Sequence, residues 1–547
     1  MKLTRVHIIK AATCGGLLDG LDVGLRGTLS GPDQFAPLCL VGPNGAGKSQ
    51  FLQVVAEAFQ TVFHACVDEE ERAKGNEDLQ FEIEYVIRSG RAREPVLVRL
   101  SRRSEGKRRP ALKIERKEGI EWVECPLEKP ATRDLLPSRV VGYTSGDNET
   151  LSLPFLVSRS GYAEAVGKQA LDRELSTKAK AKAIPDTRLM FVDYGTHLEV
   201  LVANLILGSA EERIALLNDA KLKELHSFRC VIQLAHRAVP KLSARETASR
   251  KRKGVQLTNE LESYIEQLKR CSTCHSYDEK TETYVFDFLV TGETRAAFRA
   301  FWATTIELYS ALHKLAMLND LAIPKVTRER LLRDIKTRRF ASRLPEPQDE
   351  DRVFRFEQVR FLPKVGDGVV DYVSLSDGEH QLAQILGTMC MASFANVLFL
   401  LDEPESHFNP QWRVNFISRL MELPTASGKR GEAGGTVAQQ DCLLTTHSPF
   451  VPSDMSRENV LIFKKSESAV EVRRPNIETF GTTFDTILEE CFGVSPPMSA
   501  VPRREIADLM QSDDPAAIKA GIARLGDSVE KVFLMDRLRQ FSKQEGR

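Results

Sequence analysis

The chain has 547 residues, of which 42% are hydrophobic and 28% are charged, a composition typical of globular proteins. Lysine plus arginine total 76, as do aspartate plus glutamate, so the zero formal net charge argues against a protein that coats nucleic acid through bulk charge. No apolar run reaches the roughly 18 residues that span a bilayer, and the ten cysteines lack the spacing of a disulfide framework. We therefore expect a cytoplasmic protein without membrane contact.

The first predicted domain, residues 1–160, is rich in short strand-like segments with alternating or continuous apolar residues. It also contains the strongest local motif of the chain, a phosphate-loop pattern, so we expect it to supply the phosphate-binding part of a nucleotide site. Its predicted strands cover residues 3–10, 24–28, 38–41, 81–88, 95–103, 111–117 and 139–145.

The strongest motif is GPNGAGKS, which fits the phosphate-loop pattern G-x-x-x-x-G-K-[ST] between a short apolar strand and an amphipathic helix. Glycines allow the backbone to curl so that its N–H groups face phosphates, and the following helix points its positive end at them. Lys48 would then reach the β- and γ-phosphates, and Ser49 would hold Mg²⁺. The predicted nucleotide-binding residues of this loop are Gly42, Pro43, Asn44, Gly45, Ala46, Gly47, Lys48 and Ser49.

Residues 161–349 are predicted to form a mostly helical insertion. The segments 211–228 and 294–323 show helical spacing, and a strand-like run over 282–290 lies between them. Since no heptad pattern is sustained, we expect a compact insertion suited to self or partner contacts rather than a long coiled coil.

Weaker signals in the chain each have two interpretations. Cys271, Cys274 and His275 could contribute to a metal site, but one Cys-x-x-Cys supplies only two ligands, so ordinary thiols are favoured. Basic runs could contact the phosphates of DNA or another nucleic acid, or form solvated surface; they cover residues 99–110, 245–254 and 328–340.

The second predicted lobe, residues 350–495, holds the remaining site residues. Five apolar residues at 397–401 indicate a strand buried on both faces, which ends at Asp402 and Glu403. Asp402 would complete the Mg²⁺ coordination, and Glu403 is placed to act as a general base on the attacking water. A further short strand ends near His447, which could contact the γ-phosphate or that water.

The order and spacing of these pieces resemble those of ABC-type ATPases. "DEPESHFNPQW" and "LLTTHSPF" are close to the subgroup shared by structural-maintenance, overcoming-lysogenization-defect and prokaryotic antiphage-defence ATPases. The resemblance implies an α/β fold, an ABC-type P-loop ATPase head made of two lobes with a large mostly helical insertion, followed by a helical tail over 496–547. It also implies antiparallel decoration from the runs between 81 and 145.

In that family a signature loop grips the nucleotide bound to another subunit, and here the corresponding stretch is LSDGEHQ. The resemblance assigns nucleotide contact to Ser376 and Gly378. Asp377 and Glu379 depart from the family pattern, although Glu379 stands at capping-box spacing from Ser376. Two added carboxylates should weaken closure on ATP unless they turn away or meet a basic group. We therefore predict that Asp377→Gly tightens ATP-dependent association.

The family's Gln loop would fall within residues 140–152, where this sequence has no glutamine. Ser145, Asp147 and Asn148 are the candidates to substitute for it. Because this loop is unassigned, a nucleotide switch that binds ATP and scarcely hydrolyses it remains an open alternative, although Glu403 and His447 count against it.

The resemblance is strongest to the Septu-type antiphage ATPase, and it implies an ATP- and Mg²⁺-dependent ATPase in a head-to-tail dimer or higher oligomer. Its family partner is a separate HNH nuclease, which fits a chain in which no nuclease motif is recognised. The second alternative is a DNA repair or chromosome-handling ATPase, against which the lack of coiled coils counts. A transporter subunit is disfavoured by the subgroup motifs.

Overall fold

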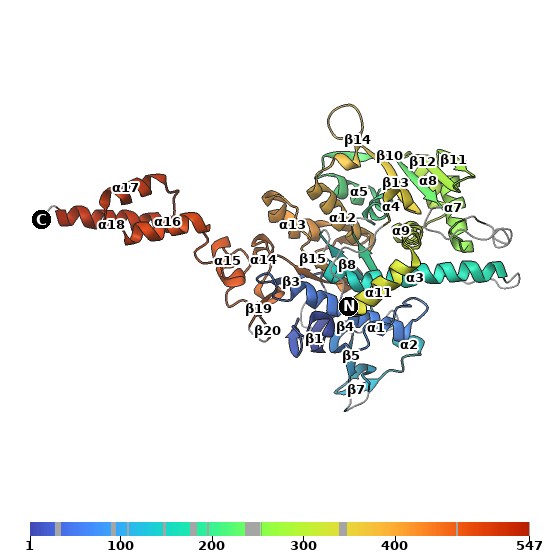
Figure 1. The fold of residues 1–547 in the computed structure, drawn as a ribbon, viewed down its shortest axis with the longest axis horizontal. Helices are drawn as coiled ribbons and strands as arrows, with labels where there is room; N and C mark the ends of the chain where they lie inside the picture. Colours follow the sequence, from blue (N-terminus) through green and yellow to red (C-terminus); the bar gives the residue numbers. More distant parts are fainter. Residues whose placement is uncertain are drawn as a thin grey trace. The chain divides into compact units, whose positions relative to one another are not determined.

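The computed structural model describes the chain as two units, Met1–Phe480 and Gly481–Arg547 (Figure 1). The division falls inside the predicted second lobe, 15 residues before its expected end. Among the helices of the described part, none combines the length and hydropathy needed to cross a bilayer. The described residues are all except 28–33, 89–94, 105, 107–108, 146–148, 176–182, 194–195, 236–251, 253, 338–346, 467–468 and 546–547.

The centre of the first unit is a seven-stranded sheet in the order β20-β19-β3-β18-β15-β8-β9, in which every pair except β19–β20 is parallel. All residues of β3, β15, β18 and β9 are buried, as expected for strands covered on both faces. The strands are β3 (Leu38–Val41), β8 (Arg139–Thr144), β9 (Leu189–Val192), β15 (Val397–Asp402), β18 (Asp441–Thr445), β19 (Val460–Lys465) and β20 (Val470–Arg473).

A six-stranded antiparallel sheet forms the second layer of this unit, in the order β2-β1-β4-β5-β6-β7, which matches most of the antiparallel decoration expected. The run at 139–145 is the exception, because β8 lies in the central sheet, parallel to β15. Its consecutive buried residues suit a central strand better than a half-exposed one. The layer consists of β1 (Lys2–Lys10), β2 (Leu21–Gly24), β4 (Gln80–Ile87), β5 (Val96–Arg103), β6 (Ala111–Glu118) and β7 (Glu121–Glu124).

Helix α1 (Lys48–Cys66), which follows the phosphate loop, is apolar and buried along most of its length. Its Phe51 and Phe59 belong to one core cluster with Ile83 of the antiparallel sheet and Leu400 of the central sheet. It also packs against the long helix α3 (Glu149–Leu175). Burial in a core shared with both sheets fixes the position at which the phosphate loop opens.

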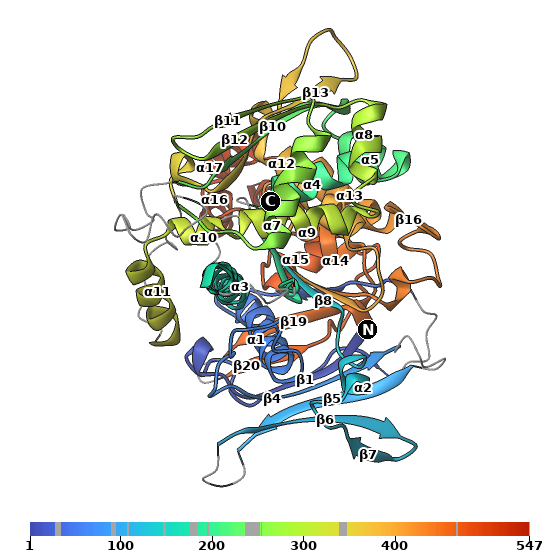
Figure 2. The ribbon, with the colours of Figure 1, turned by 90° about the vertical axis from the view of Figure 1, so that its right-hand side faces the viewer.

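The insertion adds helices and, together with β13 and β14 of the second lobe, a third sheet, β11-β12-β10-β13-β14, at the opposite end of the unit from the antiparallel layer (Figure 2). The sheet strands are β10 (Leu222–Gln233), β11 (Cys274–Asp278), β12 (Thr283–Leu289), β13 (Phe354–Pro363) and β14 (Val370–Asp371). The helices are α4 (His197–Leu207), α5 (Ala210–Leu217), α7 (Asn259–Cys271), α8 (Gly292–Arg299), α9 (Thr305–Ala316), α10 (Asn319–Ala322) and α11 (Lys325–Thr337).

The helix predicted over 211–228 holds only in its first half. α5 ends at Leu217, Lys221 takes a φ of 54°, and β10 starts at Leu222. The strand pairs with β12 on one side and β13 on the other, so tertiary pairing overrides the local helical spacing.

The second lobe contributes α12 (Asp377–Met391), which packs against α4 and α5, and α13 (Pro410–Glu422), which packs against α14 (Phe450–Ser453). Small elements of the first unit also include α2 (Pro130–Arg133) and the β16–β17 hairpin (Pro424–Thr425 and Gly428–Lys429).

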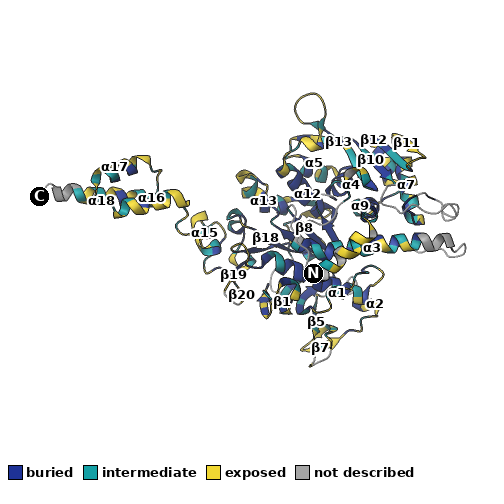
Figure 3. Ribbon diagram, viewed as in Figure 1, coloured by how far each residue is buried: buried dark blue, intermediate teal, exposed yellow. Residues whose placement is uncertain are grey.

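The second unit consists of helices and has a small core of its own. Ile506, Ile518 and Leu534 form that core, and a Cβ on Gly521 would lie 2.3 Å from the Leu509 side chain, so two helices meet closely there. Most of the described residues of this unit are exposed or intermediate in burial (Figure 3). Its helices are α15 (Phe484–Phe492), α16 (Ala500–Gln511), α17 (Pro515–Arg524) and α18 (Val529–Glu545).

Candidate nucleotide-binding site

Three adjacent parallel strands bring separate segments together at one edge of the central sheet. Asp402 of β15 stands opposite Thr445 of β18, which in turn stands opposite Leu40 of β3. Ligands of open α/β sheets bind beyond such carboxyl ends. A cleft of ≈ 480 Å³ opens there, lined by Leu17, Asn44, Gly45, Ala46, Gly47, Lys48, Ser49, Gln50, Thr150, Glu403, His447 and Lys465.

The glycines of the phosphate loop are required by its backbone shape. Gly42, Gly45 and Gly47 have φ angles of 132°, 75° and 91°, in the region that side chains disfavour. A Cβ on Gly42 would lie 2.2 Å from the carbonyl oxygen of Phe463, so the loop also packs directly on β19. The structure therefore contains the curled backbone that the motif predicts.

Lys48 is held inside the loop. Its Nζ donates to the carbonyl oxygens of Gly42 at 2.8 Å and Pro43 at 3.2 Å, and only 5% of the residue is exposed. Burial lowers the pKa of Lys48, and the neighbouring carboxylates of Glu403 and Asp402 oppose that shift. An anionic ligand would further stabilise its charged form.

Ser49 and Asp402 meet as the proposed metal ligands require. Oδ1 of Asp402 accepts hydrogen bonds from Ser49 Oγ at 2.8 Å and from Thr445 Oγ1 at 2.6 Å. Burial raises the pKa of Asp402, against the effect of these hydrogen bonds. Hard oxygen donors at the base of a phosphate loop are the ligand type that Mg²⁺ prefers, so the residues fit that ion.

Glu403 and His447 are paired within the cleft. Glu403 Oε1 lies 3.2 Å from His447 Nε2, and both side chains are partly open to solvent. The hydrogen bond from His447 is the main reason that the pKa of Glu403 is lowered. Glu403 has a φ of 48°, a strained value for a non-glycine residue, and its backbone N–H donates to Thr445 Oγ1 at 3.0 Å. An ionised carboxylate facing the cleft is suited to accept a proton from water.

Glu405 is a second, buried acid that sequence reasoning did not single out. It is 3% exposed, and its Oε1 accepts a hydrogen bond from Thr446 Oγ1. Burial raises the pKa of Glu405 to about 7. Its side chain thus ties the turn after β15 to the turn that carries His447.

The signature residues lie apart from this cleft. Ser376 caps α12 and forms a full capping box with Glu379, which confirms the spacing argument: Ser376 N and Oγ each donate to Glu379 Oε2 at 2.8 Å. Ser376 and Asp377 are exposed, and Gly378 is buried against the backbone of His407. None of the three is among the residues that line the cleft.

The predicted Gln-loop region is only partly described. Asp147 and Asn148 lie outside the described residues, whereas the Ser145 N–H donates to the carbonyl oxygen of Asp402 at 3.4 Å. Thr150, at the start of α3, lines the cleft. Sequence reasoning did not single out Thr150, although it lies within the predicted Gln-loop region, or Gln50, which directly follows the phosphate loop. It also missed Leu17, which no recognised motif contains, and Lys465, because the strand that ends there was not predicted.

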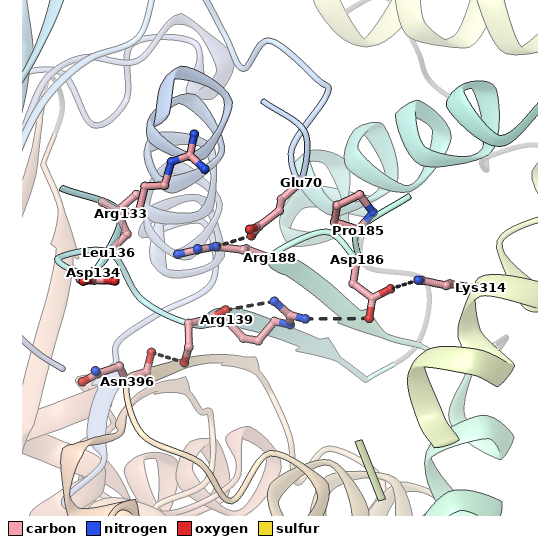
Figure 4. Close-up of a pocket in the computed structure, with 11 residues that line it drawn as sticks. Glu70, Arg133, Asp134, Leu136, Arg139, Pro185, Asp186, Arg188, Lys314 and Asn396 are labelled. Atoms are coloured by element: carbon pink, nitrogen blue, oxygen red, sulfur yellow. Dashed lines mark hydrogen bonds and ion pairs between the residues drawn. The ribbon is translucent and has the colours of Figure 1, made fainter. Parts of the chain in front are cut away.

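A second cavity, of ≈ 540 Å³, lies at the amino ends of β8 and β9. Its basic side chains face carboxylates (Figure 4): Arg188 Nε lies 2.6 Å from Glu70, and Lys314 Nζ lies 3.0 Å from Asp186. Arg139 is also directed at Asp186, at 3.9 Å. These pairs leave the cavity less suited to phosphate than the cleft.

The weaker sequence signals separate in the structure. Cys271 is buried at the end of α7, and Cys274 is exposed at the start of β11. Among the residues whose placement is described, no cluster of three or more His, Cys, Asp or Glu side chains could hold a metal ion. In the basic run 99–110, Arg99 stacks on Trp122 and Arg102 donates to backbone carbonyls, while most of 245–254 lies outside the described residues.

One comparison with known proteins agrees with an ATPase domain. Residues 294–454 match the protein-family model described as "AAA domain, putative AbiEii toxin, Type IV TA system", which spans Asp402, Glu403 and His447 but not the phosphate loop. This segment is therefore similar to an AAA-type ATPase domain. Protein ea59 of Escherichia phage lambda is 32% identical over 95 residues, 17% of this chain, and the match spans only 16% of the length of that relative.

A solved structure of an SMC head bound to the C-winged helix domain of ScpA is also similar to the chain. It has 11% sequence identity and a TM-score of 0.31, over 87% of this chain and 97% of that one. At this TM-score the likeness adds nothing to the fold or function described above.

Proposed function

We propose that this chain binds ATP together with Mg²⁺ and hydrolyses it to ADP and phosphate. The observation that carries the proposal is the meeting of Ser49, Asp402, Glu403 and His447 beside the phosphate loop. The match to an AAA-type ATPase domain supports the same reaction.

The residues of the chain divide the work of this reaction. Mg²⁺ would neutralise charge on the phosphates when bound. The loop N–H groups and Lys48 hold the phosphates, and the Ser49 and Asp402 oxygens are the ion's protein ligands. Glu403, kept ionised by the hydrogen bond from His447, accepts the proton of the attacking water.

Substitution of the base tests this proposal. Glu403→Gln keeps the shape of the side chain but removes its basicity, so we expect kcat to fall by about 10²- to 10⁴-fold while ATP binding persists. Single-turnover hydrolysis and equilibrium ATP binding measure the two effects. Glu422→Gln, at an exposed site at the end of α13, serves as the matched control. Undiminished turnover in Glu403→Gln would remove Glu403 from the base role.

We further propose that subunits assemble head to tail, with the signature of one closing over the nucleotide of another. Ser376 and Asp377 are exposed and lie outside the cleft of their own chain, which supports this arrangement. A mixture of Lys48→Met and Ser376→Arg chains should recover ATP-dependent association that neither has alone, because one composite site is then intact. Failure of every mixture to associate with ATP would contradict shared sites.

Resemblance also supports a finer role, as the ATPase subunit of an antiphage system that controls a separate HNH nuclease. The matched family's description as a putative toxin of a toxin–antitoxin system is compatible with it. Co-expression with the product of the adjacent gene should reduce phage plating, and Glu403→Gln should abolish that protection. DNA-stimulated turnover without protection would favour a DNA repair ATPase that uses the basic patches.

A further inference from the structure

The turn after β15 is held by one side chain of the signature helix. Gln381 of α12 is 3% exposed, and both ends of its amide are used. Its Oε1 accepts the backbone N–H of His407 at 2.9 Å, and its Nε2 donates to Ser406 Oγ at 3.2 Å. A buried amide that donates and accepts at once fixes helix and turn in one relative position.

The first turn of the same helix rests directly on this turn. A Cβ on Gly378 would lie 2.9 Å from the carbonyl oxygen of His407 and 3.3 Å from the Trp412 ring. Close-packed surfaces of this kind transmit displacement rather than absorb it. The N-terminus of α12 therefore cannot shift without moving residues 406–407.

At its other side the turn carries the Glu403–His447 pair. The Ser406 N–H donates to the carbonyl oxygen of Glu403 at 3.2 Å, so the residue that Gln381 holds is bonded to the base. Glu405 within the turn accepts from Thr446, whose Oγ1 also accepts the Ser448 N–H at 2.9 Å. Through the covalent chain of the turn, these hydrogen bonds thus link α12 to the residues on both sides of His447.

We propose that Gln381 is a positioning residue that couples contact at the Ser376 surface to the Glu403–His447 pair of the same subunit. The inference rests on the proposed ATPase function and assembly. When a second subunit's nucleotide engages the N-terminus of α12, movement of the helix passes through Gln381 to residues 406–407 and sets the orientation of Glu403. Hydrolysis in one site thereby depends on occupancy of the neighbouring site.

A shape-conserving variant tests the coupling. Gln381→Met removes both hydrogen bonds, so we expect kcat to fall about 10- to 100-fold through misplacement of the base, with KM within about twofold of the wild type. Gln384→Met is the control: Gln384 is buried one turn further along α12 and accepts from Tyr143 at 3.4 Å. Gln381→Glu, which keeps the acceptor for His407 but loses the donor to Ser406, should fall between Gln381→Met and the wild type.

Hydrogen exchange gives a readout that does not depend on turnover. In the wild type, a non-hydrolysable ATP analogue with Mg²⁺ should slow exchange in residues 403–409 and also in 372–384. In Gln381→Met the segment 372–384 should still respond, because it meets the neighbour's nucleotide directly, whereas the response of 403–409 should be reduced. Equal protection of both segments, or an unchanged kcat beside an active wild type, would overturn the coupling alone. A wild type without hydrolysis would overturn the proposed function and the coupling together.

Discussion

The two edges of the central sheet carry cavities of similar size but opposite character. At the carboxyl edge, Lys48 is bonded to backbone carbonyl oxygens and Asp402 to hydroxyl groups. At the amino edge, Lys314 contacts Asp186 and Glu260 directly. A charged side chain whose partners are neutral can still pair with a charged ligand. A charged side chain that is already paired with an opposite charge cannot do so without breaking that pair.

This difference shows that burial and charge alone do not identify a binding site. Lys48 and Lys314 are equally hidden, at 5% and 6% exposure, and both line a cavity. What separates them is the identity of the groups they contact. The following predictions use matched substitutions to break or sharpen that contrast.

Loss of the carboxyl-edge lysine should have the largest effect. Lys48→Met is expected to abolish measurable ATP binding, a loss of about 3 kcal/mol or more, because charge-assisted hydrogen bonds to the phosphates disappear. Its effect on thermal unfolding of the ligand-free chain should be small, since only carbonyl oxygens lose a donor. Continued tight binding by calorimetry would contradict the phosphate-loop assignment.

Loss of the amino-edge lysine should have the opposite effects: a large loss of stability and no loss of ATP binding. Lys314→Met leaves two mostly buried carboxylates, Asp186 and Glu260, without their ammonium partner. We expect the free energy of unfolding to fall by about 3–5 kcal/mol, while ATP affinity per folded molecule is unchanged. Denaturant unfolding measures the first quantity. Lost nucleotide affinity in properly folded Lys314→Met would show that the two edges are coupled.

A smaller, pH-dependent effect is expected at Glu405. Its folded-state pKa of about 7 exceeds the ordinary value of 4.5, so the folded chain retains a proton that the unfolded chain releases. This contribution to stability is therefore fully present below about pH 4.5 and lost as the pH rises through 7. Glu405→Gln should gain about 1–3 kcal/mol relative to wild type between pH 5 and 8. If Glu405→Gln differed from the wild type by the same free energy of unfolding at pH 5 and at pH 8, the raised pKa of Glu405 would be refuted.

The smallest effect is expected at the exposed Asp377. Asp377→Gly removes a carboxylate beside the anion that Ser376 is proposed to meet, so ATP-dependent association should tighten by up to about 1 kcal/mol. Sedimentation with the non-hydrolysable analogue measures the change, and Asp371→Gly, also exposed nearby, tests for a general charge effect. Weaker association would mean that Asp377 meets a cation on the second subunit.

Much of the site follows from local sequence rules. The glycines of the phosphate loop, the Asp402–Glu403 strand end and the Ser376 capping box each depend on neighbouring residues, so their patterns survive in a single sequence. Parallel packing of continuous apolar strands then brings the pieces to one edge. The α/β class was predictable for the same reason.

Features set by distant partners could not be predicted in this way. Whether an apolar run such as 139–144 pairs in parallel or antiparallel depends on the strand beside it, and β10 became a strand through its two neighbours. The burial of Glu405 and the two hydrogen bonds of the Gln381 amide depend on turns that meet only after folding. Lys465 is the last residue of a strand with no recognised motif.

The capping box at Ser376 has a consequence for how assembly begins. Its hydroxyl already serves an anion of its own chain, the Glu379 carboxylate, which occupies the start of the helix as a built-in surrogate for phosphate. An incoming nucleotide competes with Glu379 for that donor instead of finding it vacant. When the neighbouring subunit carries no nucleotide, the hydrogen bonds between Ser376 and Glu379 therefore stay intact. Only another anion, such as a bound nucleotide, can replace the Glu379 carboxylate as their acceptor.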